Sequence, residues 1–360
     1  MGLFDGKSEG GGFASTAHVA KLLGAPVLLV VDAGAMARSA AAMVHGYATF
    51  DPEVRVAGVI LNRVGSASHE AMLREAIKPL NIPVLGILFR DARMSTPDRH
   101  LGLVPVAERR GEARRALEAV RERISASCDL DGIVRLAASA GPLYAEPWDP
   151  EAPETGPFAQ VAVASGPAFS FVYEENLELL RGAGAGISVF DPTSDEALPE
   201  GTDALYLGGG FPETYAEALA ANRPLRERVR RFAAEGRPVA AECGGLLYLV
   251  QELEGHQMCG VLGARAKMTD RLILGYREGR AISESTLMGE GSLVRGHEFH
   301  YSVVEPGAGE RPAWEIVGRG PEGFVQGGVH ASYLHTHWAA MPEVPRRLVG
   351  AAARRVEARA

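Results

Sequence analysis

The chain has 360 residues and a net charge of −8, with 46% hydrophobic and 23% charged residues. This balance is typical of a globular protein with about two domains, and it excludes collagen, coiled-coil and disulfide-rich proteins. Its basic residues are scattered rather than clustered, which argues against nucleic acid and anionic membranes as partners. The three cysteines lack CxxC spacing, which favours a reducing compartment over a structural zinc site. No apolar run is long enough for a membrane helix and no signal peptide is evident, so we expect a cytoplasmic protein.

The first part of the chain alternates between two kinds of segment. Continuous apolar runs, which favour buried parallel strands, occupy residues 26–31, 56–62 and 82–88. Helix-like composition occupies residues 15–23, 36–48, 67–79 and 108–127. This alternation predicts a doubly wound α/β domain over residues 1–140.

A proline-rich linker follows at residues 141–157, where five prolines prevent a helix or strand from continuing. The alternation then restarts. Strands are predicted at residues 161–164, 186–190, 204–208 and 237–242, and helices at residues 174–182, 213–221 and 224–235. We therefore predict a second doubly wound α/β domain over residues 158–360.

A nucleophile turn is predicted around Cys243. The apolar run that precedes it leads into Glu242-Cys243-Gly244-Gly245 and then into a helix-like apolar stretch. Strand, tight turn and helix in this order form a nucleophile elbow. Glycines around the turn permit its strained backbone. We expect the turn to lift the sulfur out of the sheet towards a helix N-terminus, which lowers the thiol pKa. Cys243 is therefore the candidate nucleophile, with an inert buried cysteine as the alternative.

A cysteine nucleophile needs a base, which histidines near the C-terminus could supply. His335 follows a short apolar run at 331–334 and would stand at a strand end, within reach of a neighbouring strand end. His337 faces the same side of an extended strand and is the alternate. The remaining histidines of this region, for which packing or surface roles are the ordinary expectation, are His297, His300 and His330.

A glycine loop supplies the third component. Gly208-Gly209-Gly210 follows an apolar run, and bare backbone N–H groups in such a loop can hold the oxyanion of a tetrahedral intermediate. We expect the oxyanion hole at Gly209 and Gly244. A Gly-Gly-Gly loop is weak evidence by itself, but glycine loop, cysteine elbow and late histidine occur in the order of a glutamine-hydrolysing domain.

The second domain resembles the class I glutamine amidotransferases, and the chain is similar to their cobyrinate a,c-diamide synthase branch. The resemblance rests on LYLGGGFPE, AECGGLLYL, GHEFHYS and ASYLHTHW in the second domain, and on MGLFDG, STAHVAKLLGAPVLLVVDA, GVILNRVGS and RHLGLVP in the first. It implies an ATP- and Mg²⁺-dependent ligase that amidates the a and c acetate carboxylates of cobyrinate, with glutamine as nitrogen donor. It also implies that Cys243 is the nucleophile and that His335 raises its nucleophilicity. In the wider class a Glu usually stands two residues after this histidine. Here that position is His337, so we expect a Cys-His dyad rather than a triad.

For the first domain the resemblance implies a dethiobiotin-synthetase-like, P-loop-type fold. Binding of ATP phosphates there needs a Gly-rich loop, a lysine and a hydroxyl for Mg²⁺, yet GxxxxGK[ST] does not occur. Residues 2–8, GLFDGKS, are one residue short between the glycines and leave no room for a preceding strand. In the family MGLFDG lies downstream of the P-loop, so we expect the chain to begin inside a longer, here truncated, synthetase domain.

By the same resemblance, Asn62 and Asp32 are candidate nucleotide-binding residues and Asp5 is a candidate Mg²⁺ ligand, with solvated loop carboxylates as the alternative. The resemblance further implies a homodimer. The aromatic and cationic segment 169–181 is a candidate contact for the large ring. Alternatives to cobyrinate as substrate are hydrogenobyrinate and nickel sirohydrochlorin, and a non-catalytic tetrapyrrole-binding protein is the alternative to an enzyme.

Overall fold

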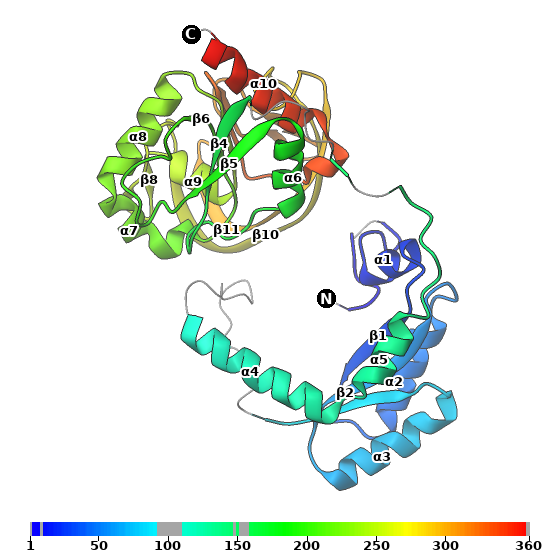
Figure 1. The fold of residues 1–360 in the computed structure, drawn as a ribbon. Helices are drawn as coiled ribbons and strands as arrows, with labels where there is room; N and C mark the ends of the chain where they lie inside the picture. Colours follow the sequence, from blue (N-terminus) through cyan, green and yellow to red (C-terminus); the bar gives the residue numbers. More distant parts are fainter. Residues whose placement is uncertain (1, 8–9, 92–109, 147–148, 151–157, 358–360) are drawn as a thin grey trace. The chain divides into compact units, whose positions relative to one another are not determined.

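A computed structural model of the protein describes residues 2–7, 10–91, 110–146, 149–150 and 158–357. The RHLGLVP segment and residues 147–148 and 151–157 of the predicted linker lie outside the described residues. Contacts divide the chain into two compact units, Met1–Pro147 and Trp148–Ala360. They are called the N-terminal and C-terminal units below, and each is described by itself (Figure 1).

The N-terminal unit is built on a parallel sheet whose strand order is β1-β2-β3. Its strands are β1 (Val27–Asp32), β2 (Val56–Val64) and β3 (Val84–Phe89). Its helices are α1 (Thr16–Leu22), α2 (Arg38–Thr49), α3 (Ala67–Ile77), the short 3-10 helix η1 (Lys78–Leu80), α4 (Arg110–Ser127) and α5 (Leu130–Ala137). The predicted strands and helices of this unit are all present within a few residues.

Helices cover both faces of this sheet, as a doubly wound layer requires. On one face α2 and α3 bury Val44 and Leu73 against the strands. On the other face Gly58 of β2 leaves room for Leu136 of α5, which would lie 3.2 Å from a Cβ at that position. Ser66 directly precedes helix α3, and its side chain accepts a hydrogen bond from the His69 N–H and so caps the first turn.

The C-terminal unit is built on a six-stranded sheet with the order β14-β15-β7-β6-β4-β5. Its strands are β4 (Ala159–Ala164), β5 (Ala185–Phe190), β6 (Thr202–Leu207), β7 (Val239–Glu242), β14 (Phe324–Gln326) and β15 (Val329–Ser332). All neighbours pair in parallel except β14 and β15. Its helices are α6 (Glu174–Gly182), the 3-10 helix η3 (Pro212–Tyr215), α7 (Ala216–Ala221), α8 (Arg223–Ala234), α9 (Gly244–Leu249), the 3-10 helix η4 (Trp338–Ala340) and α10 (Glu343–Glu357).

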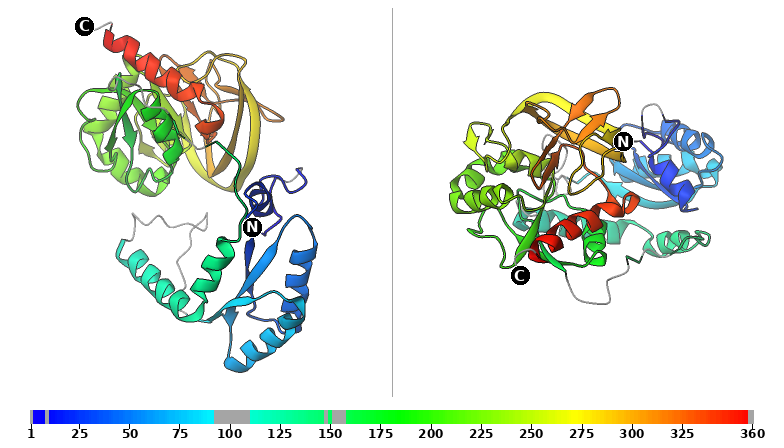
Figure 2. Two further views of the ribbon diagram at one scale, coloured as in Figure 1. Left: turned by 45° about the vertical axis from the view of Figure 1, so that its right-hand side comes forward. Right: turned by 90° about the horizontal axis from the view of Figure 1, so that it is seen from above.

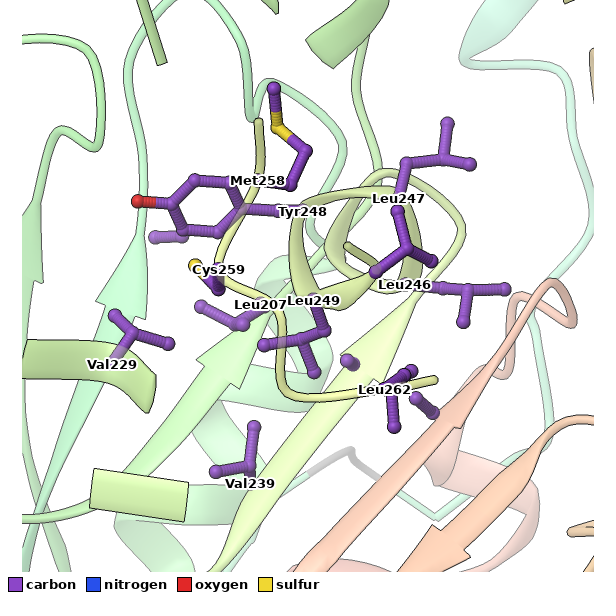
Figure 3. Packing of buried hydrophobic residues seen from close by; sticks show 14 of the residues in the cluster. Leu207, Val229, Val239, Leu246, Leu247, Tyr248, Leu249, Met258, Cys259 and Leu262 are labelled. Carbon is purple, nitrogen blue, oxygen red and sulfur yellow. The ribbon is translucent and has the colours of Figure 1, made fainter. Parts of the chain in front are cut away.

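Two hydrophobic cores flank this sheet because its strand residues alternate between faces. Leu205 and Leu207 of β6 face the core formed with α7, α8 and α9, whereas Ala204 and Tyr206 face the core formed with α6 and α10. Figure 2 shows α10 and α6 lying together over one face of the sheet. Helix α9 is wholly buried, and Figure 3 shows its side chains packed among those of β6, β7, α8 and the following loop.

A second sheet of the C-terminal unit was not anticipated from the sequence. Its main part is an antiparallel ribbon of β10 (Arg265–Ala281) and β11 (Leu293–Glu305). The smaller strands are β8 (Glu252–Leu253), β9 (His256–Gln257), β12 (Trp314–Ile316) and β13 (Gly320–Glu322). The ribbon is half exposed, so its apolar residues never form the continuous runs that revealed the parallel strands. β11 carries His297 next to the candidate site, so this unpredicted element matters for function.

Candidate functional site

The backbone at Cys243 has the predicted elbow form. Cys243 separates β7 from α9 and has φ +47° and ψ −97°, a left-handed conformation that a side chain rarely adopts. Its N–H donates to the Ser332 carbonyl on β15 (2.8 Å), and its own carbonyl accepts from the Leu247 N–H (3.1 Å). These bonds fix the strained residue at the end of the sheet.

Close packing explains why the residues after Cys243 are glycines. A Cβ at Gly245 would lie 2.1 Å from the Leu207 carbonyl oxygen, and one at Gly244 would lie 2.9 Å from the Gly210 backbone nitrogen. The elbow can therefore approach the end of β6 only because both side chains are absent. Sequence reasoning predicted this turn correctly.

The expected low pKa of the Cys243 thiol is wrong for this conformation. Burial raises the pKa to about 12, the charge of Glu213 adds to this, and a hydrogen bond from the Gly244 N–H opposes it. Desolvation of the thiolate thus outweighs the effect of the short helix α9. The resting nucleophile is a neutral thiol, which must lose a proton before or during attack.

The structure brings His335 to the glycine loop. A Cβ at Gly209 would lie 2.4 Å from Cε1 and 3.3 Å from Nδ1 of His335, so the imidazole lies directly against the Gly209 backbone. Gly244, at the start of α9, packs against the same loop, since a Cβ at Gly244 would lie 3.3 Å from the Gly209 carbonyl carbon. The loop therefore connects the cysteine elbow to the histidine.

The His335 ring is buried and held from β11. Its backbone pairs with that of His297 through two hydrogen bonds of 2.9 and 3.1 Å, and the two rings stack with centroids 4.9 Å apart. Burial, with smaller contributions from the nearby His297 and His300, lowers the pKa of His335 to about 3. The imidazole is therefore neutral and free to accept a proton.

His337 occupies a different environment from His335. Its side chain is 42% exposed, its Nε2 lies 3.6 Å from a carboxylate oxygen of Glu175, and its ring lies against Tyr173 with centroids 4.7 Å apart. Both neighbours belong to the start of α6 rather than to the glycine loop. The geometry thus favours His335 over His337 as the partner of Cys243.

The Gly209 amide is not available for the expected oxyanion hole. Its N–H donates to the Phe171 carbonyl (2.9 Å), and the Phe171 N–H donates back to the Gly209 carbonyl (3.0 Å). Within the described part of the chain, the Gly210 N–H has no such partner, and it is the amide that faces Gly244. Of the loop amides, Gly210 is therefore the candidate oxyanion donor to act with Gly244.

The predicted ring-contact segment also reaches this site. Phe171 lies beside Gly209 with 40% of its surface exposed, and its ring lies 5.3 Å from that of Phe211. Phe169, in contrast, is buried against Tyr248. The segment therefore borders the glycine loop through one exposed aromatic side chain.

A charged cluster on the second sheet escaped sequence reasoning. Glu298 is buried between Arg277 (2.5 Å) and Arg319 (3.4 Å), and its charge contributes to the raised pKa of Cys243 after larger causes. In the described structure, Nη2 of Arg277 and Nε2 of His300 are buried without a hydrogen-bond partner. In the sequence, only the motif GHEFHYS pointed to this region. The cluster itself could not be predicted, because it is the pairing of β10 with β11 that brings Arg277 to Glu298.

In the N-terminal unit, Asp32 and Asn62 end up side by side. They are paired positions of β1 and β2. Asp32 accepts hydrogen bonds from the Gly34 N–H (2.9 Å) and from Arg63 (2.8 Å), and Asn62 accepts from the Arg63 N–H (2.9 Å). This carboxyl end of a parallel sheet is where α/β domains bind their ligands.

Asp5 belongs to no cluster of three or more metal-binding side chains among the described residues. Its carboxylate accepts a hydrogen bond from the Gly2 N–H (2.7 Å). Among the described residues no three His, Cys, Asp or Glu side chains gather as a metal site would require. The described carboxylates therefore do not fit a Mg²⁺ site made by the protein alone.

No helix in the described ranges is both long enough and apolar enough to cross a membrane. Comparison with known families gives two matches. Residues 160–342 match the CobB/CobQ-like glutamine amidotransferase domain, and residues 8–104 match the CobQ/CobB/MinD/ParA nucleotide binding domain. The first match contains the Cys243 elbow, and the second contains Asp32 and Asn62. These matches confirm the two predicted types of domain.

Whole-chain relatives give the same result. The chain is 53% identical to a hydrogenobyrinate a,c-diamide synthase of Streptomyces coelicolor, over 97% of this chain and 79% of the relative. It is 50% identical to a protein of the same name from Thermobifida fusca, over 98% and 77%. It is 44% identical to a cobyrinate a,c-diamide synthase of Gloeobacter violaceus, over 97% and 77%.

Solved structures resemble part of the chain. A glutamine amidotransferase of Thermotoga maritima aligns with a TM-score of 0.35 and 16% identity, over 56% of this chain and 93% of its own. The family itself follows from the sequence relatives. With a nucleotide-binding domain, a glutamine amidotransferase domain and relatives of at least 44% identity across nearly its whole length, the chain belongs to the hydrogenobyrinate and cobyrinate a,c-diamide synthase family.

Proposed function

We propose that this protein converts the a and c acetate carboxylates of a corrin-type tetrapyrrole into amides, with glutamine as the nitrogen donor and ATP as the activating nucleotide. The single observation that carries the amidotransferase half is the left-handed Cys243 elbow with the His335 ring lying on its glycine loop. Family membership carries the other half, since the relatives are named for this reaction on their substrates.

Hydrogenobyrinate is the substrate we place first. The relatives that carry its name are 48–53% identical to this chain, whereas those named for cobyrinate are 40–44% identical. Cobyrinate, which the sequence alone put first, becomes the second candidate. The two compounds differ at the ring centre and share the acetate arms on which the chemistry occurs.

The glutamine step begins from a neutral pair. Because the pKa of Cys243 is raised to about 12 and that of His335 is lowered to about 3, both by burial, thiol and imidazole are uncharged at neutral pH. The thiol proton passes to His335 as the sulfur forms a bond to the amide carbon of glutamine. The carbonyl π electrons move to oxygen and give a tetrahedral oxyanion.

Backbone amides stabilise this oxyanion. We assign this role to the N–H groups of Gly210 and Gly244, which lie next to each other at the elbow, because the Gly209 N–H already donates to the Phe171 carbonyl. The carbon–nitrogen bond then breaks, and the imidazolium of His335 returns its proton to the leaving nitrogen, which departs as ammonia. Water hydrolyses the remaining thioester to glutamate and restores the thiol.

Amidation itself needs an activated carboxylate, because a free carboxylate is a poor electrophile. ATP supplies this activation by transferring a phosphoryl group, and ammonia then displaces phosphate from the acyl phosphate. We assign nucleotide contacts to Asn62 and Asp32 at the carboxyl end of the N-terminal sheet. Mg²⁺ would arrive with the phosphates of ATP; we derive no step from Asp5, because the described carboxylates do not form a metal site by themselves.

The test is an assay of the purified protein with ATP, Mg²⁺ and glutamine, in which hydrogenobyrinate and cobyrinate are supplied in separate reactions. The products are identified by mass spectrometry. We expect a diamide from hydrogenobyrinate with a larger kcat/KM than from cobyrinate. Preference for cobyrinate would reverse the order of substrates. No diamide from either would refute the proposal. A homodimer stays a prediction from the resemblance, and a cytoplasmic location stays a prediction from the sequence.

A further inference from the structure

A buried carboxylate stands immediately before the nucleophile, and the reaction described above does not use it. Glu242 ends β7 with 6% of its surface exposed. Burial raises its pKa to about 7, against which hydrogen bonds from Thr336 and Tyr206 act. An ionisable group is costly to bury without a partner, so its contacts indicate why it is kept there.

Those contacts join the two halves of the candidate dyad. One carboxylate oxygen accepts hydrogen bonds from both the backbone N–H (3.2 Å) and the hydroxyl (2.5 Å) of Thr336. The other oxygen accepts from the Tyr206 hydroxyl (3.2 Å). Glu242 directly precedes Cys243, and Thr336 directly follows His335. A single side chain therefore connects the two short segments that present the nucleophile and the base.

A second layer of donors keeps the bonds pointing at the carboxylate. The Trp338 indole donates to the Thr336 hydroxyl oxygen (3.0 Å), so that hydroxyl is left to donate its own proton to Glu242. Asn176 donates to the Tyr206 hydroxyl oxygen (3.2 Å) and to the Thr336 carbonyl (3.2 Å). The Asn176 side-chain oxygen accepts from the Trp338 N–H (2.9 Å). Each member of this buried network is satisfied, which makes it rigid and specific.

The other side of His335 is fixed independently. Its backbone pairs with His297 of β11, so residues 335 and 336 are held from two different elements. Loss of the Thr336 anchor would leave His335 attached on one side only. The proton transfer between a neutral thiol and a neutral imidazole depends on their distance and alignment, so such a loss acts on the chemical step.

We propose that Glu242 and Thr336 are positioning residues, whose hydrogen bond holds His335 against the glycine loop in register with Cys243. This inference rests on the proposed glutamine hydrolysis. Neither residue touches the reacting atoms. Their substitution lowers kcat for glutamate release and leaves the KM for glutamine and the ammonia-dependent reaction near their wild-type values.

The central variant is Thr336→Val, which keeps the shape and the backbone N–H and removes only the hydroxyl. We expect kcat for glutamine hydrolysis to fall by about 10- to 100-fold, in the range measured when a catalytic group is misplaced by about 1 Å. Thr336→Ser restores the hydroxyl and is expected to recover most of the activity. Thr202→Val is the matched control, since Thr202 is a buried threonine whose hydroxyl bonds the Pro199 carbonyl (2.6 Å) at the opposite end of β6.

A double-mutant cycle tests the bond itself. Because Glu242→Leu and Thr336→Val each remove the hydrogen bond between the Glu242 carboxylate and the Thr336 hydroxyl, the double variant should be no slower than about the slower single variant, rather than showing the product of the two losses. Amidation with ammonium chloride in place of glutamine, measured on every variant, reports whether the protein is folded and its synthetase site intact.

The outcomes separate cleanly. Low kcat with unchanged KM for Thr336→Val, recovery by Thr336→Ser and coupling with Glu242→Leu support the inference. Wild-type kcat in Thr336→Val, independent losses in the cycle, or an equal loss in Thr202→Val would overturn it while glutamine hydrolysis by the wild type still stands. Absence of glutamate release by the wild-type protein would instead refute the proposed function, and the inference with it.

Discussion

Substitution of Gly209 by Ala tests the placement of His335 most sharply. The added methyl would lie 2.4 Å from Cε1 and 3.3 Å from Nδ1 of His335. Carbon atoms in contact stay about 3.5–4.0 Å apart, so the ring must move by about 1 Å. Its stacking on His297, with centroids 4.9 Å apart, leaves little freedom to do so without leaving its position.

The expected effect is a loss of about 100-fold in kcat for glutamine hydrolysis, the cost of a 1 Å displacement of a catalytic group. The crowding itself would cost roughly 1–3 kcal/mol of stability. The KM for glutamine should change little, since the Gly209 N–H is kept and remains bonded to Phe171. Glutamate release under saturating glutamine measures kcat, and amidation with ammonium chloride shows whether the synthetase reaction survives.

Gly263→Ala is the matched control, because nothing lies within 4 Å of a Cβ at that position and Gly263 belongs to the same unit. It should retain wild-type kcat. If Gly209→Ala also kept kcat within about threefold of wild type, far from the loss a displaced base entails, the His335 ring would not be the base held by this loop. An equal loss in the ammonia reaction would point to misfolding instead.

Four further predictions concern charge, proton transfer and packing. Because the raised pKa of about 12 keeps Cys243 protonated, its alkylation by iodoacetamide should speed up about tenfold per pH unit from pH 6 to 9; a plateau near pH 8 would contradict the neutral thiol. Glu242 has a folded pKa of about 7 against an ordinary 4.5, so its contribution to stability is full below pH 4.5 and lost as the pH rises through 7. The free energy of unfolding of the wild type relative to that of Glu242→Gln, measured with denaturant, should therefore fall by about 3 kcal/mol as the pH rises from 4.5 to above 7. A difference that stays constant with pH would refute this. His335→Ala should lower the rate of glutamine hydrolysis by about 10³-fold or more. His337→Ala should lower it by less than about tenfold, because the His337 side chain is half exposed beside α6. The reverse ranking in a glutamate-release assay would exchange their roles. Leu348→Ala in the fully buried face of α10 should lower the free energy of unfolding by about 2–5 kcal/mol, and a loss below about 1 kcal/mol in urea would show that α10 packs less tightly than described.

The sequence sufficed for the parallel layers because both faces of such a sheet are buried. Strands β1, β4, β6 and β7 are nearly continuous apolar runs, and each was predicted to within about two residues. The Cys243 elbow could be predicted for the same reason, since its strand, its turn glycines and its helix are contiguous. Local pattern is enough where the physical cause is local.

The ribbon of β10 and β11 could not be predicted in this way. Its strands expose alternate residues irregularly, and their pairing joins positions that no periodicity links. The same holds for the hydrogen bonds that decide the site. The Gly209 N–H donates to the carbonyl of Phe171, 38 residues away in the sequence, and the Thr336 hydroxyl donates to Glu242, 94 residues away. Such contacts depend on strand order in the folded sheet, so the Gly210 amide and Glu242 emerged only from the structure.

The most direct test compares wild type with Cys243→Ala in the amidation of hydrogenobyrinate with ATP and Mg²⁺, using glutamine in one series and ammonium chloride in the other. If Cys243 releases ammonia for a separate synthetase reaction, the variant will form no diamide from glutamine and will form it from ammonium chloride at close to the wild-type rate. Diamide formation from glutamine by Cys243→Ala would contradict the assignment of the nucleophile.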